Sequence, residues 1–91
     1  MPADERIYVG SKPILAYVTA VVTALSKSDS VSVMARGRAI STAVDVVEVT
    51  KRSILTDILV DGIDIGTERL GEAGAERNVS TISIQLSKPK A

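Results

Sequence analysis

The stretch VSVMARGRAISTAVDVVEV, residues 31–49, holds a strand pattern, a break and a helix pattern in direct succession. Valines alternating with polar residues predict a strand through about residue 35. Arg36-Gly37-Arg38 interrupts that alternation. From Ala39 to about Ser53, apolar side chains recur at three- and four-residue spacing, which predicts a helix. A strand that runs through a short basic loop into a helix is typical of an α/β domain.

The predicted helix 39–53 has one apolar stripe. Ile40, Val44, Val47 and Lys51 share it, and Ala43 lies beside it, whereas most charged side chains lie on the other side. Valine lowers intrinsic helix propensity because its branched side chain is restricted in a helix. We therefore expect packing of this stripe to stabilise the helix.

The same design occurs earlier in the chain. Residues 6–10 form a short apolar strand pattern that ends at Gly10, and Ser11-Lys12-Pro13 has the hydroxyl and the proline of a helix start. Apolar residues at 14, 18, 21, 22 and 25 extend the helix to about Lys27. A strand–helix–strand crossover places its two strands parallel and near each other.

Two further strands complete the pattern. Apolar residues alternate with aspartates over residues 58–65, and Gly62 breaks the phase, which predicts a bulge. Residues 79–87 alternate regularly, with Ile82, Ile84 and Leu86 on one side. Residues 67–78 are polar and predict a mobile hairpin arm. The chain of 91 residues is thus expected to form one domain over 1–91, in the order β-α-β-α-β-β, with a four-stranded mixed sheet and two helices on one face.

Composition narrows the classes of function. The chain has no cysteine and no histidine, which removes thiolate nucleophiles, imidazole bases and the usual zinc ligands. No apolar run reaches the roughly 18 residues of a membrane span, and the N-terminal residues lack the regions of a signal peptide. We expect a cytoplasmic, non-enzymatic protein without cofactor, metal, membrane or small-molecule substrate.

The charge is unevenly distributed although its sum is zero. Six of the eleven acids and one of the eleven bases fall within residues 57–76, so the remaining residues carry ten bases against five acids. A basic face is compatible with the neutral sum. Asp57, Asp61 and Asp64 admit a metal site or an acid pair, but the solvent face of a strand explains them more simply.

The two strand-to-helix junctions carry the candidate site. Parallel neighbouring strands end at the same edge of the sheet, where α/β folds commonly bind ligands. Lys12, Arg36 and Arg38 are therefore expected together, beside two helix N-termini whose free N–H groups suit phosphate oxygens. The alternative is a basic loop that only improves solubility. Tyr8 and Tyr17 are expected in the core or at its margin, and not as a base-stacking platform.

The residues around both junctions resemble a known family. Ala35-Arg36-Gly37-Arg38-Ala39-Ile40-Ser41 with the helix that follows, the Gly10-x-Lys12-Pro13 junction, and Val79-Ser80-Thr81-Ile82 closely match the signature of the Alba proteins of archaea. The resemblance covers about residues 6–88. It implies a fold similar to the C-terminal domain of translation initiation factor three, and a dimer that binds double-stranded DNA and also RNA.

The resemblance also implies roles for individual residues. The nucleic-acid contacts would be Ser11, Lys12, Arg36, Gly37, Arg38 and Lys51, with Arg69 and Arg77 in the arm that follows the minor groove. Ser11 stands where many Alba proteins carry a lysine whose acetylation weakens DNA binding. Ile54 stands where a phenylalanine often makes the contact between neighbouring dimers. Family members are usually more basic, so we expect weaker binding here.

These observations favour a dimer that binds double-stranded DNA through its phosphates, largely without regard to sequence, and organises the chromosome in the nucleoid. Two alternatives stay open. One is an RNA-binding protein acting in RNA stability or ribonucleoprotein assembly. The other is a heterodimer subunit that pairs with a more basic paralogue, which the neutral charge favours.

Overall fold

The computed structural model of this protein describes residues 5–89. It contains, in chain order, β1 (Glu5–Tyr8), α1 (Ile14–Lys27), β2 (Ser30–Arg36), α2 (Ala39–Ser53), β3 (Leu59–Leu70) and β4 (Arg77–Ser87). The predicted order of elements is confirmed, and the bounds of α2 agree with the prediction. Residues 1–4 and 90–91 lie outside the described residues. The ends of the expected domain 1–91 and the N-terminal residues that were compared with a signal peptide therefore fall outside the described structure.

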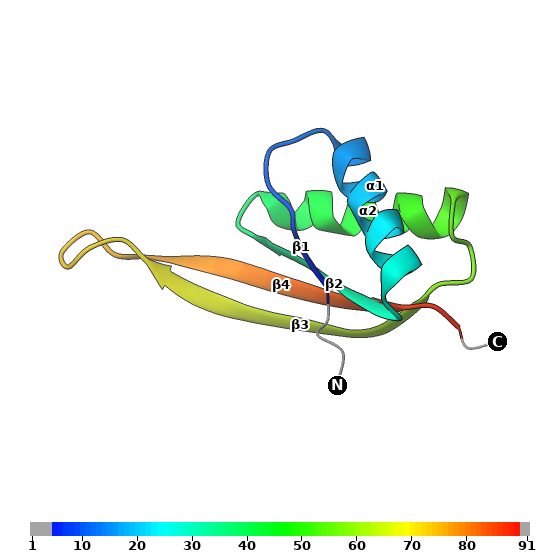
Figure 1. Ribbon diagram of the computed structural model, residues 1–91. Helices are drawn as coiled ribbons and strands as arrows, with labels where there is room; N and C mark the ends of the chain where they lie inside the picture. Colours follow the sequence, from blue (N-terminus) through cyan, green and yellow to red (C-terminus); the bar gives the residue numbers. More distant parts are fainter. Residues whose placement is uncertain (1–4, 90–91) are drawn as a thin grey trace.

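The strands form one mixed sheet in the order β1-β2-β4-β3. β1 and β2 are parallel, as the crossover predicts, and the other two pairings are antiparallel. Both helices lie on the same face of this sheet, and no element within residues 5–89 covers the other face (Figure 1). The fold is the two-layer α/β sandwich that the sequence predicts. Within residues 5–89, neither helix has both the length and the apolar character needed to cross a bilayer.

The core lies between the helices and the centre of the sheet, and it is almost entirely aliphatic. β2 and β4 contribute side chains at alternate positions, because successive residues of a strand point to opposite faces. The buried set includes Val31, Val33, Ile84 and Leu86 from the sheet, and Val18, Val21, Leu25, Ala43, Val46 and Val47 from the helices. Tyr17 is the one aromatic side chain among the buried residues of the described chain.

The buried face of α2 differs from the predicted stripe. Ala43, Val46, Val47 and Thr50 are buried, whereas Val44 and Lys51 are exposed. The sequence pattern did not favour a face containing a threonine. Thr50 is nevertheless fully buried because its hydroxyl donates a hydrogen bond to the Val46 carbonyl at 2.8 Å, which satisfies the polar group.

The start of α1 also differs from the prediction in its capping. Pro13, and not Ser11, occupies the N-cap position, and no side chain makes a capping hydrogen bond. The fixed φ of proline suits a helix start, since the missing N–H would have no partner within the helix. The predicted hydroxyl cap at Ser11 is therefore wrong, although the helix begins where the sequence indicated.

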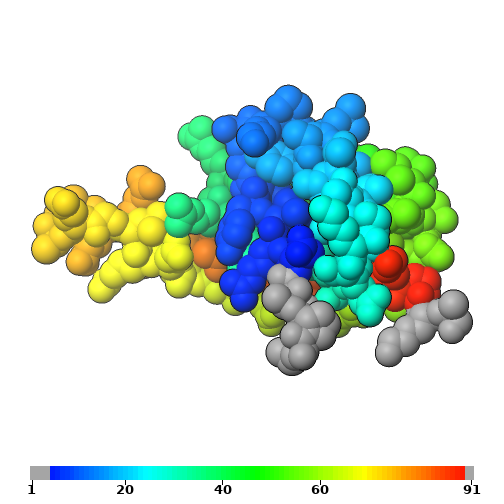
Figure 2. Space-filling model, viewed as in Figure 1, coloured from blue at the N-terminus to red at the C-terminus, as the bar shows by residue number. Residues whose placement is uncertain are grey.

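β3 and β4 form a long hairpin that projects from the body of the molecule (Figures 1 and 2). The pairing shifts register between Val60 and Gly62, which confirms the predicted bulge. The ladder continues to the pair Leu70↔Arg77, further than the sequence indicated. The unpaired tip is thus residues 71–76, where Gly71 and Gly74 have positive φ. The hairpin gives the molecule its long dimension of 52 Å.

Candidate nucleic-acid interface

The first junction, residues 9–13 between β1 and α1, is held in shape by Tyr17. The Tyr17 hydroxyl accepts hydrogen bonds from the backbone N–H of Gly10 at 2.9 Å and of Lys12 at 3.0 Å. Its ring is buried, with 7% of the residue exposed. The expected place of Tyr17 in the core is confirmed. The role of its hydroxyl as a hydrogen-bond acceptor for the loop could not be predicted from the spacing of apolar residues. That role depends on how α1 packs against the loop in the folded chain.

The second junction, between β2 and α2, depends on the conformation of Gly37. Its φ is +60°, a left-handed value that side-chain-bearing residues rarely adopt. Its N–H donates to the Ser80 carbonyl at 2.8 Å, and its carbonyl accepts from the Ile40 N–H at 3.2 Å. A Cβ there would lie 3.5 Å from Val79, an ordinary contact. The turn therefore requires glycine for its backbone angle and not for lack of space.

Both helix starts keep backbone N–H groups without a side-chain partner. Neither α1 nor α2 has a side-chain cap hydrogen bond, and neither has an acid in its first turn. The first N–H groups of a helix have no partner within it, and the helix dipole adds partial positive charge there. Arg38 is the N-cap residue of α2, and Lys12 precedes α1 directly before Pro13. This arrangement favours an anion at each start.

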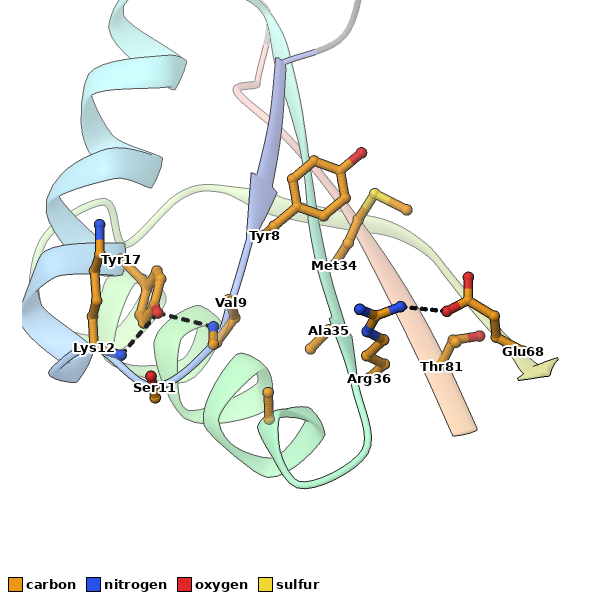
Figure 3. Close-up of a pocket in the computed structure, with 12 residues that line it drawn as sticks. Tyr8, Val9, Ser11, Lys12, Tyr17, Met34, Ala35, Arg36, Glu68 and Thr81 are labelled. Carbon is orange, nitrogen blue, oxygen red and sulfur yellow. Dashed lines mark hydrogen bonds and ion pairs between the residues drawn. The ribbon is translucent and has the colours of Figure 1, made fainter. Parts of the chain in front are cut away.

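A hollow joins the two junctions at one edge of the sheet (Figure 3). It is lined by Ser11 and Lys12 from the first junction, by Ala35 and Arg36 from the end of β2, and by Tyr8 and Met34. The structure thus brings both junctions together, as predicted. Gly37 and Arg38 lie outside the lining of the hollow, at the start of α2.

The cations of the hollow diverge. The Lys12 side chain extends along α1, whereas Arg36 turns toward β3 (Figure 3). There the Arg36 guanidinium donates to the Glu68 carboxylate at 2.5 Å, in a pair whose side chains are 59% and 47% exposed. Neither junction contains an acid in its own sequence, and the fold supplies one from another strand. Pairing of β2, β4 and β3 could have indicated it, since Arg36 is opposite Thr81 and Thr81 is opposite Gly66.

The other predicted contact residues lie away from the hollow. Lys51 is in the last turn of α2, and Ile54 is the C-cap residue of that helix, 49% exposed. Both are thus at the opposite end of α2 from Arg38. Arg69 lies on the hairpin and forms an ion pair with Glu76 at 3.7 Å. Arg77 begins β4 and is exposed.

Two apolar features were not anticipated from the sequence. Tyr8, expected in the core or at its margin, is 66% exposed. On the helix side of the sheet, β3 leaves Ile63 and Ile65 exposed by 58% and 82%, since the helices do not extend over this edge strand. Asp61 and Asp64 are exposed on β3, as the solvent-face interpretation predicts, whereas Asp57 is exposed in the turn that precedes this strand.

The apolar surface formed by the exposed isoleucines of β3 extends to α2. Ile65 lines a shallow hollow together with Ile40 of α2 and Ile82 of β4. Val44, also on α2, is 43% exposed. We call Ile40, Val44, Ile63, Ile65 and Ile82 the α2–β3 apolar patch. A lone exposed isoleucine needs no explanation, but a contiguous group of this kind is typical of a contact surface.

The fold and the two junctions define a small two-layer α/β domain that presents two uncapped helix starts at one sheet edge. The family model for Alba matches residues 5–67. This chain is 48% identical to the DNA/RNA-binding protein Alba of Methanocella arvoryzae, over 100% of this chain and 97% of that protein. It is 49% identical to the DNA/RNA-binding protein Alba of Methanothrix thermoacetophila, over 97% and 100%. The chain belongs to the Alba family.

Solved structures agree with this assignment. Alba from Thermoplasma volcanium superposes with a TM-score of 0.85 at 38% identity, covering 92% of this chain and 100% of that one. An Alba protein of Trypanosoma brucei has the same fold, with a TM-score of 0.78 at 24% identity, covering 99% of this chain and 74% of that one.

Proposed function

We propose that this protein binds the phosphate backbone of double-stranded nucleic acid, with DNA as its main partner, and catalyses no reaction. The observation that carries the proposal is the pair of uncapped helix starts at one sheet edge. A basic residue directly adjoins each start, and neither first turn contains an acid. Phosphate oxygens accept hydrogen bonds from free N–H groups and gain from the helix dipole. The names of the relatives, DNA/RNA-binding protein Alba, support this reading.

The junction residues have different proposed roles in phosphate binding. Lys12 and Arg38 are exposed basic residues that directly adjoin the two helix starts in the sequence, and the Ser11 hydroxyl lies in the same loop as Lys12. Arg36 binds phosphate only after exchanging its partner, because Glu68 holds its guanidinium. Gly37 acts through its backbone angle, since its N–H is already donated to Ser80. Contacts of this kind hold a duplex without reading its bases.

The remaining basic residues extend the footprint. Arg69 and Arg77 lie on the projecting hairpin, from which they reach along the duplex toward the minor groove. Lys51 provides a further cation at the far end of α2. Each phosphate neutralised releases counterions and adds to the affinity. Because Glu76 already pairs with Arg69, the hairpin contributes less to the affinity for nucleic acid than its two arginines suggest.

A dimer doubles this small set of charges. The α2–β3 apolar patch supplies a surface on which a second copy, or a more basic paralogue, packs. Two copies related by a twofold axis present two junction edges to one duplex. Ile54 at the end of α2 then lies free for contacts between neighbouring dimers. Proteins arrayed in this way along DNA would organise the chromosome, and the protein would localise to the nucleoid.

Matched DNA and RNA duplexes of the same sequence and length test the choice of partner. We expect tighter binding to DNA at equal salt. Tighter binding to RNA favours the second candidate, a role in RNA stability or ribonucleoprotein assembly, which the names of the relatives equally support. Absence of binding to either duplex contradicts the proposed function. Purification of the tagged protein from its own cells distinguishes a homodimer from a heterodimer.

A further inference from the structure

Tyr8 lies on the sheet face that the helices leave uncovered. Its two chain neighbours, Ile7 on β1 and Val9 directly after β1, pack toward the helices, so the Tyr8 side chain points to the opposite face. It is 66% exposed although it is large and aromatic. No proposed duplex contact uses it, and the α2–β3 apolar patch is on the other side of the sheet.

Met34 extends the apolar surface of Tyr8. The two residues are register partners on the parallel strands β1 and β2, and both line the hollow at the junction edge. Figure 3 shows their side chains next to each other, with Arg36 further along β2. An aromatic ring beside a polarisable thioether is a surface on which a flat ring stacks well.

Cations flank this surface along the strands. Arg6 precedes Tyr8 by two residues on β1, and Arg36 follows Met34 by two residues on β2, so both share the uncovered face. With a rise of about 3.3 Å per residue, each of the two arginines is about 6.6 Å along the sheet from the Tyr8–Met34 pair. An aromatic ring between two cations matches the chemistry of a nucleotide, a flat base with a phosphate on either side.

We propose that Arg6, Tyr8, Met34 and Arg36 form a site for an unpaired nucleotide of RNA or single-stranded DNA. The nucleobase stacks on Tyr8, one flanking phosphate binds Arg6, and the other binds Arg36 after displacing the Glu68 carboxylate from its guanidinium. A base inside a duplex keeps both faces covered by its neighbours, so only a single strand, a loop or an overhang supplies a free base. The ligand class rests on the proposed function, but the residues do not include Lys12 or Arg38.

The test compares three short oligonucleotides of one sequence: single-stranded RNA, single-stranded DNA and a blunt DNA duplex. We expect Tyr8→Leu to weaken binding of at least one single strand by about tenfold, as loss of a stacking aromatic does, and to change duplex affinity by less than about twofold. Tyr8→Phe retains the ring and should bind both single strands like the wild type. Leu59→Ala is the matched control, because Leu59 is also exposed but lies on the opposite edge strand.

A second measurement uses the unaltered protein, so it does not depend on the folding of a variant. Photocrosslinking of a single strand containing 4-thiouridine or 4-thiothymidine should attach the label to the peptide that contains Tyr8. Crosslinking only to other peptides, or equal single-strand affinity of the wild type and Tyr8→Leu, would overturn the proposal. Equal loss of duplex and single-strand binding in Tyr8→Leu would also overturn it. Failure of the proposed duplex function appears separately, as an unchanged duplex affinity in Lys12→Ala.

Discussion

Arg36 and Glu68 form an ion pair across β4, although they are 32 residues apart in the chain. Arg36 is the last residue of β2, at the junction with α2, and Glu68 lies on the hairpin strand β3. The carboxylate thus occupies the position that a phosphate would take on this guanidinium. Because both side chains are about half exposed, the pair contributes only about 0–1 kcal/mol to stability. A phosphate bound at the proposed site would therefore displace Glu68 at small cost.

Glu68→Gln should raise duplex affinity about two- to fivefold at low salt, since a neutral amide competes less well for Arg36. Fluorescence anisotropy with a labelled duplex measures it. Glu72→Gln is the matched control: it makes the same change in net charge on the same hairpin, where Glu72 forms no ion pair within residues 5–89. The gain at Glu68 should exceed that at Glu72, and should do so only while Arg36 is present. Equal gains would show a general charge effect and no competition.

The Arg36–Glu68 pair shows where sequence reasoning stops. Local patterns predicted the order of the elements, the bounds of α2 and the bulge at Gly62, because these depend on neighbouring residues. The position of Glu68 beside Arg36 depends on the strand order β2-β4-β3, which no local pattern contains. The buried face of α2 was predicted wrongly for a related reason. Thr50 reads as polar until its hydrogen bond to Val46 is known.

The solvent exposure of side chains was the property least well predicted from the sequence. Alternation correctly gave the two faces of β3 and β4, but it could not show that the helices stop short of β3 and leave Ile65 uncovered. Similarly, the apolar neighbours of Tyr8 suggested the core or its margin, whereas the strand places that ring on the uncovered face. The two junctions were predictable as a unit, because parallel strands end at one edge.

The hairpin acids should oppose duplex binding. Glu76 pairs with Arg69, and Glu72 adds a further negative charge near the tip. The double variant Glu72→Gln with Glu76→Gln releases Arg69 and removes two charges, so duplex affinity at low salt should rise. The same titration in high salt should show a smaller rise, because salt screens exposed charges. A fall in affinity would mean that these acids contact a partner directly.

Removal of the Tyr17 hydroxyl should loosen the first junction. Tyr17→Phe retains the buried ring but leaves the N–H groups of Gly10 and Lys12 without their acceptor. We expect the free energy of unfolding to fall by about 1–2 kcal/mol in denaturant titrations, together with weaker duplex binding. Tyr8→Phe removes a hydroxyl from an exposed tyrosine and should change stability by less than about 0.5 kcal/mol. Equal stability of both variants would contradict this role of Tyr17.

A charge in the α2–β3 apolar patch should separate the proposed dimer. Ile65 is 82% exposed in the single chain, so Ile65→Asp should fold normally but bury an unpaired charge at the contact. Sedimentation should give twice the 9.6 kDa chain mass for the wild type and the chain mass itself for the variant. Leu15→Asp makes a comparable change on α1, where Leu15 is 69% exposed, and should leave the dimer intact. A monomeric wild type at micromolar concentration would contradict the dimer.

The salt dependence of duplex binding tests the phosphate site at the two helix starts most directly. Lys12→Ala and Arg38→Ala should each weaken binding and make the slope of log affinity against log salt shallower by about one unit. Thermal stability should hardly change, because both side chains are exposed. Arg52→Ala, which removes an exposed base from the last turn of α2, is the control for general charge. Wild-type affinity and slope in both junction variants would contradict the account.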